Sequence, residues 1–242
     1  MIGSVLETLK AVGADRNTLI VFTSDHGDML GERSMWFKKH FFEPSLRVPL
    51  FVYAPWIQSQ RVQEHASLVD LLPTFASAAS DSNWEDSVDP LAGTNLLTLL
   101  DRGNPAPTRA VYAEYLAEAA LAPIFMIQRG TFKYICSTAD PTLMFDVATD
   151  PDELVNLAGD ATHAERLAAF AEEANTVWDA EQIHRDILKS QRRRRLVRAA
   201  HAQGTEVRWN HGEQPGETVP WYRGDAGYSE WAFDYMPRKT RS

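Results

Sequence analysis

A short apolar segment that ends in a polar turn does most to limit how this chain can fold. Residues 18–24 (TLIVFTS) are apolar or β-branched almost throughout, which is typical of a buried strand. Asp25, His26 and Gly27 follow at once, and the glycine lets the backbone turn sharply. Because ligands bind beyond the carboxyl ends of strands in open α/β sheets, Asp25 and His26 mark the first candidate site.

Neighbouring segments favour an α/β arrangement for the first part of the chain. Residues 1–13 predict an amphipathic helix, with Gly13 where the helix should end. Residues 50–53 (LFVY) predict a second strand, and residues 67–79 predict a helix that Pro73 starts or kinks. Strands and helices in this order predict a central sheet covered by helices.

The second part of the chain changes to short strands and then to helices. Four segments predict a small antiparallel sheet: residues 111–115, 124–128, 131–136 and 143–147. Arg129 and Gly130 predict the two-residue turn of a hairpin, since glycine supplies the positive φ. Residues 163–200 predict one or two helices with an apolar stripe, and an aromatic tail follows. We therefore expect three regions: an α/β region at residues 1–105, a β subdomain at 106–160, and helix and tail at 161–242.

Composition and charge narrow the classes of function. Of the 242 residues, 44% are hydrophobic and 24% are charged, so we expect a folded globular protein. The net charge of −9 argues against a nucleic-acid partner. No apolar segment approaches the ~20 residues that span a bilayer, and residues 1–15 lack the pattern of a signal peptide, so we expect no membrane partner.

The single cysteine and a run of arginines have plain structural interpretations. Because Cys136 is alone, an internal disulfide is excluded, which favours a reducing, cytoplasmic location. We expect Cys136 to be a buried structural thiol. Residues 192–195 (RRRR) are expected to form a solvated or subunit-contacting helix face, and a phosphate-binding patch is the alternative.

Asp25 and His26 allow two interpretations. Carboxylate oxygens suit hard divalent ions and imidazole shifts the preference toward transition metals, so the pair suits a metal site. Two adjacent ligands cannot close such a site, and the other ligands would come from elsewhere in the fold. The alternative interpretation is an ordinary turn after a strand.

Five segments follow one another along the first two thirds of the chain: residues 24–32 (SDHGDMLGE), 36–38 (WFK), 42–50 (FE and RVPL at its ends), 67–74 (SLVDLLPT) and 144–157 (MFDVATDPDELVNL). Together they resemble the sulfatase branch of the alkaline phosphatase superfamily, over roughly residues 1–160. The WFK spacing and residues 191–195 (QRRRR) resemble the C-terminal half of the choline sulfatases in particular. The resemblance implies the C-terminal part of an alkaline-phosphatase-like central sheet with flanking helices, beside the small antiparallel sheet and the tail.

The resemblance also implies a reaction and a set of site residues. Sulfatases hydrolyse sulfate monoesters with a divalent cation and a formylglycine made from Cys or Ser in a C/S-x-P-x-R motif. By resemblance, Asp25 and His26 are ligands of that cation, Ca²⁺ or Mn²⁺, and Lys38 contacts the sulfate. An exposed surface lysine is the alternative for Lys38.

The tail adds a substrate expectation. A trimethylammonium group needs an aromatic face and a carboxylate, which Tyr235 and Asp234 offer. Residues 233–237 (FDYMP) resemble the aromatic-acidic tail with which choline sulfatases reach a neighbouring subunit's active site. This resemblance implies choline sulfate as the substrate and a homo-oligomer of the full-length enzyme as the assembly. A tail that merely packs on the protein is the alternative.

One departure from the family pattern concerns the nucleophile. The chain has no C/S-x-P-x-R motif: residues 105–109 (PAPTR) begin with proline, and Cys136 is followed by Ser-Thr-Ala. The family's first aspartate pair is also missing, and the resemblance places both features in the N-terminal half of a full sulfatase. A phosphonate or phosphate ester hydrolase of the same superfamily and a non-catalytic fragment are therefore alternatives. The strand at residues 19–22 is apolar on both faces, and we expect most of its natural neighbours to come from that N-terminal half.

Overall fold

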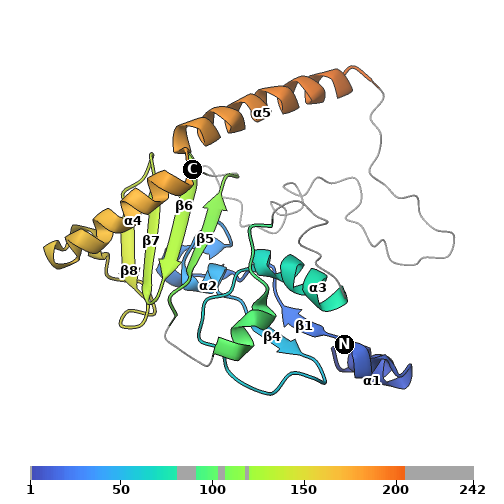
Figure 1. The fold of residues 1–242 in the computed structure, drawn as a ribbon. Coiled ribbons are helices and arrows are strands. Elements are labelled where there is room, and N and C mark those ends of the chain that lie inside the picture. The colour runs from blue at the N-terminus through green and yellow to red at the C-terminus, as the bar shows by residue number, and fades with distance from the viewer. Residues whose placement is uncertain (1, 81–90, 103–106, 118–119, 205–242) are drawn as a thin grey trace, which may run out of the picture. The chain divides into compact units, whose positions relative to one another are not determined.

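The computed structural model describes residues 2–80, 91–102, 107–117 and 120–204 (Figure 1). The predicted substrate-binding residues Asp234 and Tyr235 lie outside these ranges. The chain divides into two compact units, Met1–Ile187 and Leu188–Ser242. Within the described ranges, no helix combines the length and apolar character needed to cross a membrane.

The two helices predicted in the first part of the chain are present. α1 (Ile2–Ala11) is followed by Gly13 in the left-handed conformation (φ 72°), which ends the helix as predicted. α3 (Leu71–Ala79) follows a short 3₁₀ turn in which Ser67 and Asp70 cap each other's backbone N–H groups. Pro73 lies in the first turn of α3, where a missing N–H is tolerated, so it starts the helix and does not kink it.

The two predicted strands of this part pair with each other. β1 (Ile20–Thr23) and β4 (Leu50–Tyr53) form an antiparallel ladder. The prediction that β1 is buried is wrong: Phe22 is 42% exposed, and Phe51 opposite it is 66% exposed. Among the described residues β1 and β4 pair only with each other, so the outer edge of each strand has no strand partner and part of one face is exposed.

A four-stranded antiparallel sheet follows, as predicted. Its strands are neighbours in chain order: β5 (Ala110–Tyr115), β6 (Ile124–Arg129), β7 (Phe132–Ser137) and β8 (Leu143–Asp146). The predicted Arg129–Gly130 turn is wrong by one residue, because Arg129 still pairs with Phe132. The turn consists of Gly130 and Thr131, and Gly130 has the predicted positive φ (59°).

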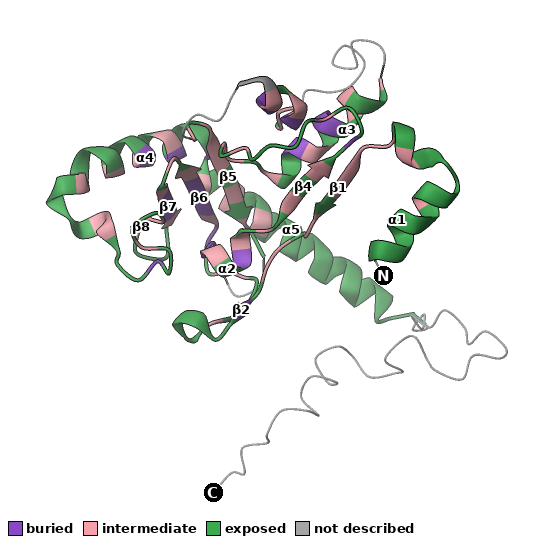
Figure 2. Cartoon of the chain, turned by 90° about the horizontal axis from the view of Figure 1, so that it is seen from below, coloured by how far each residue is buried: buried purple, intermediate pink, exposed green. Residues whose placement is uncertain are grey.

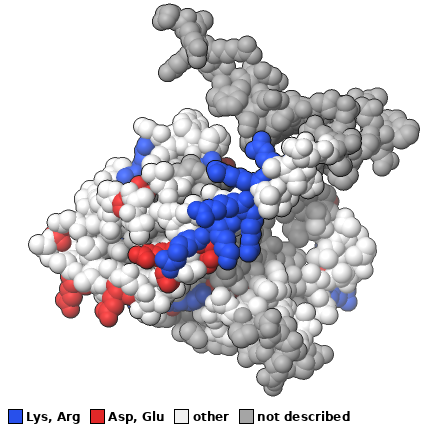
Figure 3. Space-filling model, turned by 90° about the horizontal axis from the view of Figure 1, so that it is seen from above, with Lys and Arg blue, Asp and Glu red and all other residues white. Residues whose placement is uncertain are grey.

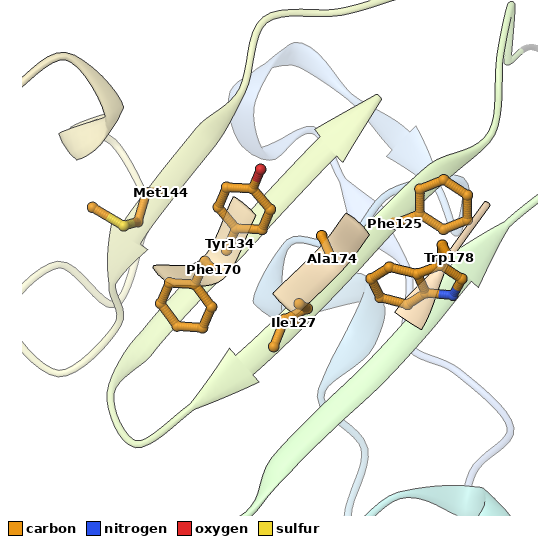
Figure 4. Packing of buried hydrophobic residues seen from close by; sticks show 7 residues of the cluster. All are labelled: Phe125, Ile127, Tyr134, Met144, Phe170, Ala174 and Trp178. Carbon is orange, nitrogen blue, oxygen red and sulfur yellow. The ribbon is translucent and has the colours of Figure 1, made fainter. Parts of the chain in front are cut away.

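α4 (Ala164–Val177) covers one face of this sheet (Figure 4). The Tyr134 ring stacks on Phe170 with 5.6 Å between centroids, and Phe125 stacks on Trp178 at 4.7 Å. Cys136 packs against the same cluster, as expected for a structural thiol. It is only partly buried, so the prediction of a fully buried side chain is wrong. Burial raises the pKa of this thiol.

α5 (Ala180–His201) extends from the first compact unit into the second. It carries residues 192–195, and all four arginines are exposed, as predicted for a solvated face. Figure 3 shows Lys and Arg side chains gathered along this helix.

The other face of the four-stranded sheet packs against residues 29–46, which carry the candidate site. Side chains alternate along a strand, so Met126 and Ile135 point away from α4 and pack with Met29 and Phe42 instead. Four short elements lie in this segment: β2 (Met29–Leu30), a 3₁₀ turn (Glu32–Ser34), β3 (Trp36–Phe37) and the one-turn helix α2 (Glu43–Leu46). Figure 2 shows buried residues concentrated on β6 and β7.

Candidate functional site

Residues 24–38, here called the site loop, lead from the end of β1 toward α2. Asp25 and His26 are its second and third residues. β2 and β3 then pair as a short hairpin, with Met29 opposite Phe37, and this pairing turns the chain back on itself. Lys38 follows β3 directly and therefore returns to the start of the loop.

The three predicted site residues of the loop come together. Lys38 Nζ lies 2.6 Å from His26 Nε2, which in turn lies 3.3 Å from Asp25 Oδ2. His26 Nδ1 is 2.8 Å from the carbonyl oxygen of Gly27. The Lys38 ammonium group beside Nε2 and the Gly27 carbonyl beside Nδ1 both favour the neutral tautomer with its proton on Nδ1, in which Nε2 accepts from Lys38 and Nδ1 donates to Gly27. The backbone of Gly27 and the side chain of Lys38 thus favour the same tautomer of the ring.

The Asp25 carboxylate is open to solvent and ionised. Its side chain is 82% exposed, and its Oδ1 accepts hydrogen bonds from the His26 amide at 3.0 Å and from the Ser24 hydroxyl at 3.3 Å. Desolvation is the largest single influence and raises the pKa of Asp25, but the His26 amide, the nearby His26 ring, the backbone of Asp25 and the Ser24 hydroxyl together outweigh it, so the net pKa lies below its usual value.

The start of the loop is held by α2. The Gly27 N–H donates to the Ser45 carbonyl oxygen at 2.8 Å. A Cβ atom at position 27 would lie 2.0 Å from the Pro44 carbonyl oxygen, which leaves room only for glycine. This close approach keeps His26 at a defined distance from α2.

The middle of the loop is held by the segment after β8. Arg33 donates a hydrogen bond to the backbone carbonyl of Glu153, and its guanidinium group lies 4.3 Å from the ring centroid of Phe42. Arg33 and Glu153 both have left-handed backbones, with φ of 55° and 54°. Such conformations are unfavourable for residues other than glycine and persist where the surroundings hold them.

Buried charges adjoin this contact, and no role had been predicted for them. Lys133 of β7 is fully buried, with Nζ at 2.6 Å from Glu43 Oε1 and 2.8 Å from Glu153 Oε1. Glu43 and Glu153 lie in two of the segments that resemble sulfatases, and this position was the one sign in the sequence that they could have a role. Lys133 lies inside an otherwise apolar strand, and nothing in its neighbourhood in the sequence singles it out.

The arginine of the incomplete motif at residues 105–109 has a structural role. Arg109 forms a two-pronged ion pair with the buried Asp70, with both N···O distances 2.6 Å. Burial raises the pKa of Asp70, but the hydrogen bonds from Arg109 and from backbone amides outweigh it and lower the pKa.

Asp25 and His26 fit a divalent cation as two ligands of a larger set. Nε2 of His26 keeps the lone pair that a metal ligand needs, and the carboxylate beside it is ionised. In the part of the chain that the structure describes, no group of three or more His, Cys, Asp and Glu side chains could hold a metal ion. Lys38 hydrogen-bonds to the same lone pair, so a cation on Nε2 requires the ammonium group to turn elsewhere.

Comparison with known proteins gives consistent relatives. Residues 1–82 match the family model described as Sulfatase. A choline-sulfatase of Rhizobium meliloti (strain 1021) is 37% identical over 219 residues, which are 87% of this chain and 41% of that protein. Arylsulfatase K of Gallus gallus is 33% identical over 170 residues, 65% of this chain and 31% of that protein. The chain spans less than half the length of the curated relatives it matches.

Solved structures agree with these relatives. The structure of BT4656 in complex with its substrate D-glucosamine-2-N,6-O-disulfate has a TM-score of 0.61 and 28% identity, covering 76% of this chain and 38% of that one. The phosphonate monoester hydrolase of Agrobacterium radiobacter has a TM-score of 0.60 and 30% identity, covering 72% of this chain and 37% of that one.

Proposed function

This chain is a relative of the sulfatases of the alkaline phosphatase superfamily, and we propose that it supplies the cation-binding and sulfate-binding half of a sulfuric ester hydrolase. The contact between Lys38 and His26 carries the proposal. Two cation ligands and one sulfate-binding ammonium group, all expected from the sequence, meet within 2.6 and 3.3 Å at the end of β1.

Each of these residues has a separate task. Asp25 and His26 hold a divalent cation, for which Ca²⁺ and Mn²⁺ are the candidates. When bound, such a cation neutralises negative charge on the sulfate oxygens. The lowered pKa of Asp25 keeps its carboxylate charged at neutral pH. Gly27 holds the ring of His26 in the tautomer that leaves Nε2 free to accept.

Lys38 binds the sulfate group. Its ammonium is a compact positive charge on a flexible stem, so it is able to leave Nε2 and pair with a sulfate oxygen. A fixed positive charge there stabilises the negative charge that shifts toward the leaving oxygen in the transition state. In this proposal Lys38 contacts His26 when no substrate is bound and contacts the sulfate group when substrate is bound.

Choline sulfate is the proposed substrate. The similarity to a choline-sulfatase over 87% of this chain supports it. Asp234 and Tyr235 are proposed to meet the trimethylammonium group of that substrate with a carboxylate and an aromatic face. The nucleophile is proposed to be a formylglycine on a separate segment, because the 242 residues contain no C/S-x-P-x-R motif.

A phosphonate ester hydrolase is the second candidate, favoured by the 30% identity to the phosphonate monoester hydrolase. The same cation ligands and ammonium group suit a phosphonate as well as a sulfate, since both present charged oxygens. A non-catalytic fragment is the third candidate, favoured by the missing motif.

The test is to co-express the chain with a sulfatase segment that carries a C/S-x-P-x-R motif. We expect chelator-sensitive release of sulfate from choline sulfate, which Lys38→Ala lowers about 10²–10³-fold and the control Lys10→Ala leaves unchanged. Faster hydrolysis of a phosphonate monoester favours the second candidate. No hydrolysis of either ester by the folded complex favours the third. Sulfate release by the isolated chain contradicts the proposed origin of the nucleophile.

A further inference from the structure

The buried cluster of Lys133, Glu43 and Glu153 lies next to the candidate site but is not part of it. An ammonium group that is removed from water is unfavourable unless it is paired, and Lys133 is paired with two carboxylates. Glu153 is itself only 1% exposed, and its second oxygen, Oε2, accepts the backbone N–H of Glu43 at 2.7 Å. Glu153 therefore binds both the side chain of Lys133 and the backbone of α2.

One line of contacts leads from this cluster to His26. Glu43 is the first residue of α2, so its position sets the position of that helix. The Ser45 carbonyl of α2 accepts from Gly27, and the Gly27 carbonyl accepts from the ring of His26. The tautomer and orientation of the ring thus depend on where α2 is held.

A second contact leads from the same residue to the middle of the site loop. The backbone carbonyl of Glu153 accepts from Arg33, which lies over the rings of Phe42 and Phe145 at 4.3 and 5.7 Å. Glu153 presents this carbonyl because its own backbone is left-handed (φ 54°). Glu153 thus holds the site loop directly at Arg33 and indirectly, through α2, at Gly27.

We propose that Glu153 is a positioning residue of the candidate site and that Lys133 supports it. Through α2 and Arg33, the four-stranded sheet holds Asp25, His26 and Lys38 in the arrangement described above. The four-stranded sheet then helps to set the positions of the site residues, in addition to stabilising the fold. The positioning contacts are independent of the proposed function. Only the purpose of the arrangement, binding a cation and a sulfate group, rests on the proposed function.

The test compares Glu153→Gln with the matched control Glu173→Gln. Glu173 also joins the sheet to another element, through an ion pair with Arg129 at 2.7 Å, but it contacts neither α2 nor the site loop. Two NMR readouts are used on the full chain: amide hydrogen exchange, and the ¹⁵N signals of the His26 ring with the ring neutral. Neither readout needs catalysis.

We expect Glu153→Gln to speed exchange at the Gly27 amide at least tenfold and to mix the two ring tautomers of His26, with exchange in β6 and β7 unchanged. Glu173→Gln is expected to change neither readout. Arg33→Gln, at an exposed position, removes the second contact without a buried charge and is expected to speed exchange across residues 29–36. It decides the question if Glu153→Gln fails to fold.

Unchanged Gly27 exchange and an unchanged tautomer in folded Glu153→Gln overturn the proposal. So does acceleration that is equal in the site loop and in β6 and β7, since that result marks a general loss of stability. If Glu153→Gln fails to fold, unchanged exchange in Arg33→Gln overturns it. Mn²⁺ broadening of the wild-type His26 signals is measured separately: its absence counts against the proposed function and leaves the positioning result intact.

Discussion

Lys38 Nζ reaches His26 Nε2 at 2.6 Å across twelve residues of sequence because the β2–β3 hairpin folds the chain back between them. The hairpin has only two residues in each strand, so it does not hold this distance by itself. Gly27 and Arg33 supply the rest through their contacts with α2 and Glu153.

Replacing Gly27 is expected to damage the site and the fold together. Gly27→Ala puts a Cβ atom 2.0 Å from the Pro44 carbonyl oxygen, so the loop or α2 has to move. We expect a loss of about 1–3 kcal/mol in the free energy of unfolding, measured by urea denaturation. Gly3→Ala is the control: it meets no atom within 4 Å on α1 and is expected to stabilise by about 0.5–1 kcal/mol. Equal stability of Gly27→Ala and wild type contradicts the described packing.

Divalent cations are expected to bind weakly to this chain alone. Asp25 and His26 offer two ligands where a tight site uses six or more oxygen-type ligands. Titration with Mn²⁺, followed by paramagnetic broadening, is expected to give a Kd of about 10⁻³ M or weaker. Asp25→Asn is expected to abolish the effect, and Asp15→Asn, at a partly buried position outside the site loop, to leave it. A tight stoichiometric site would mean that further ligands exist.

The Asp70–Arg109 pair predicts a loss of stability in acid. The folded state lowers the pKa of Asp70 below its ordinary value of about 4, so the pair stabilises fully above that pH. The stabilisation is lost as the pH falls through the folded-state pKa. Urea denaturation from pH 6 to pH 2.5 is expected to show the difference between wild type and Asp70→Asn shrinking toward low pH. A difference that stays constant over this range rules the mechanism out.

The unpaired outer edges and the exposed face of the β1–β4 pair predict self-association. Phe22 and Phe51 are exposed neighbours, with ring centroids 6.0 Å apart, and β1 has one strand partner among the described residues. Light scattering is expected to show concentration-dependent assembly that Phe51→Lys reduces. Leu154→Lys, at an exposed apolar residue elsewhere, is the control. A monodisperse wild-type monomer with cooperative melting counts against this expectation.

Local patterns in the sequence were sufficient to find most elements. Alternation and apolar periodicity predicted the four strands of the small sheet and the helices α1, α3, α4 and α5, with ends within a few residues of those observed. Gly130 pointed to the hairpin turn, but its position was one residue off because Arg129 suits a strand end as well as a turn. β2 and β3 were missed, since two residues are too few to carry a pattern.

The burial of β1 and the cluster around Lys133 depend on contacts that no local pattern encodes. An apolar run looks the same whether or not a second neighbouring strand covers it. Lys133 meets Glu43 and Glu153, which are 90 and 20 residues away in the chain, so the sequence around it gives no sign of the partners. Asp25 and His26 were found from their position after a predicted strand, and Lys38 from the family resemblance. The contacts that hold these residues were found from neither.

Side chains alternate between the two faces of the sheet along β6, so two neighbouring residues can serve as spectroscopic probes of opposite faces. Phe125 contacts Trp178 on the α4 side, and its neighbour Met126 belongs to the cluster that includes Met29 at the base of the site loop. A fluorinated Phe125 and a ¹³C-methyl Met126 would therefore sense different surroundings one residue apart. Movement of the loop on ligand binding would appear in the methyl spectrum while the fluorine signal stays still.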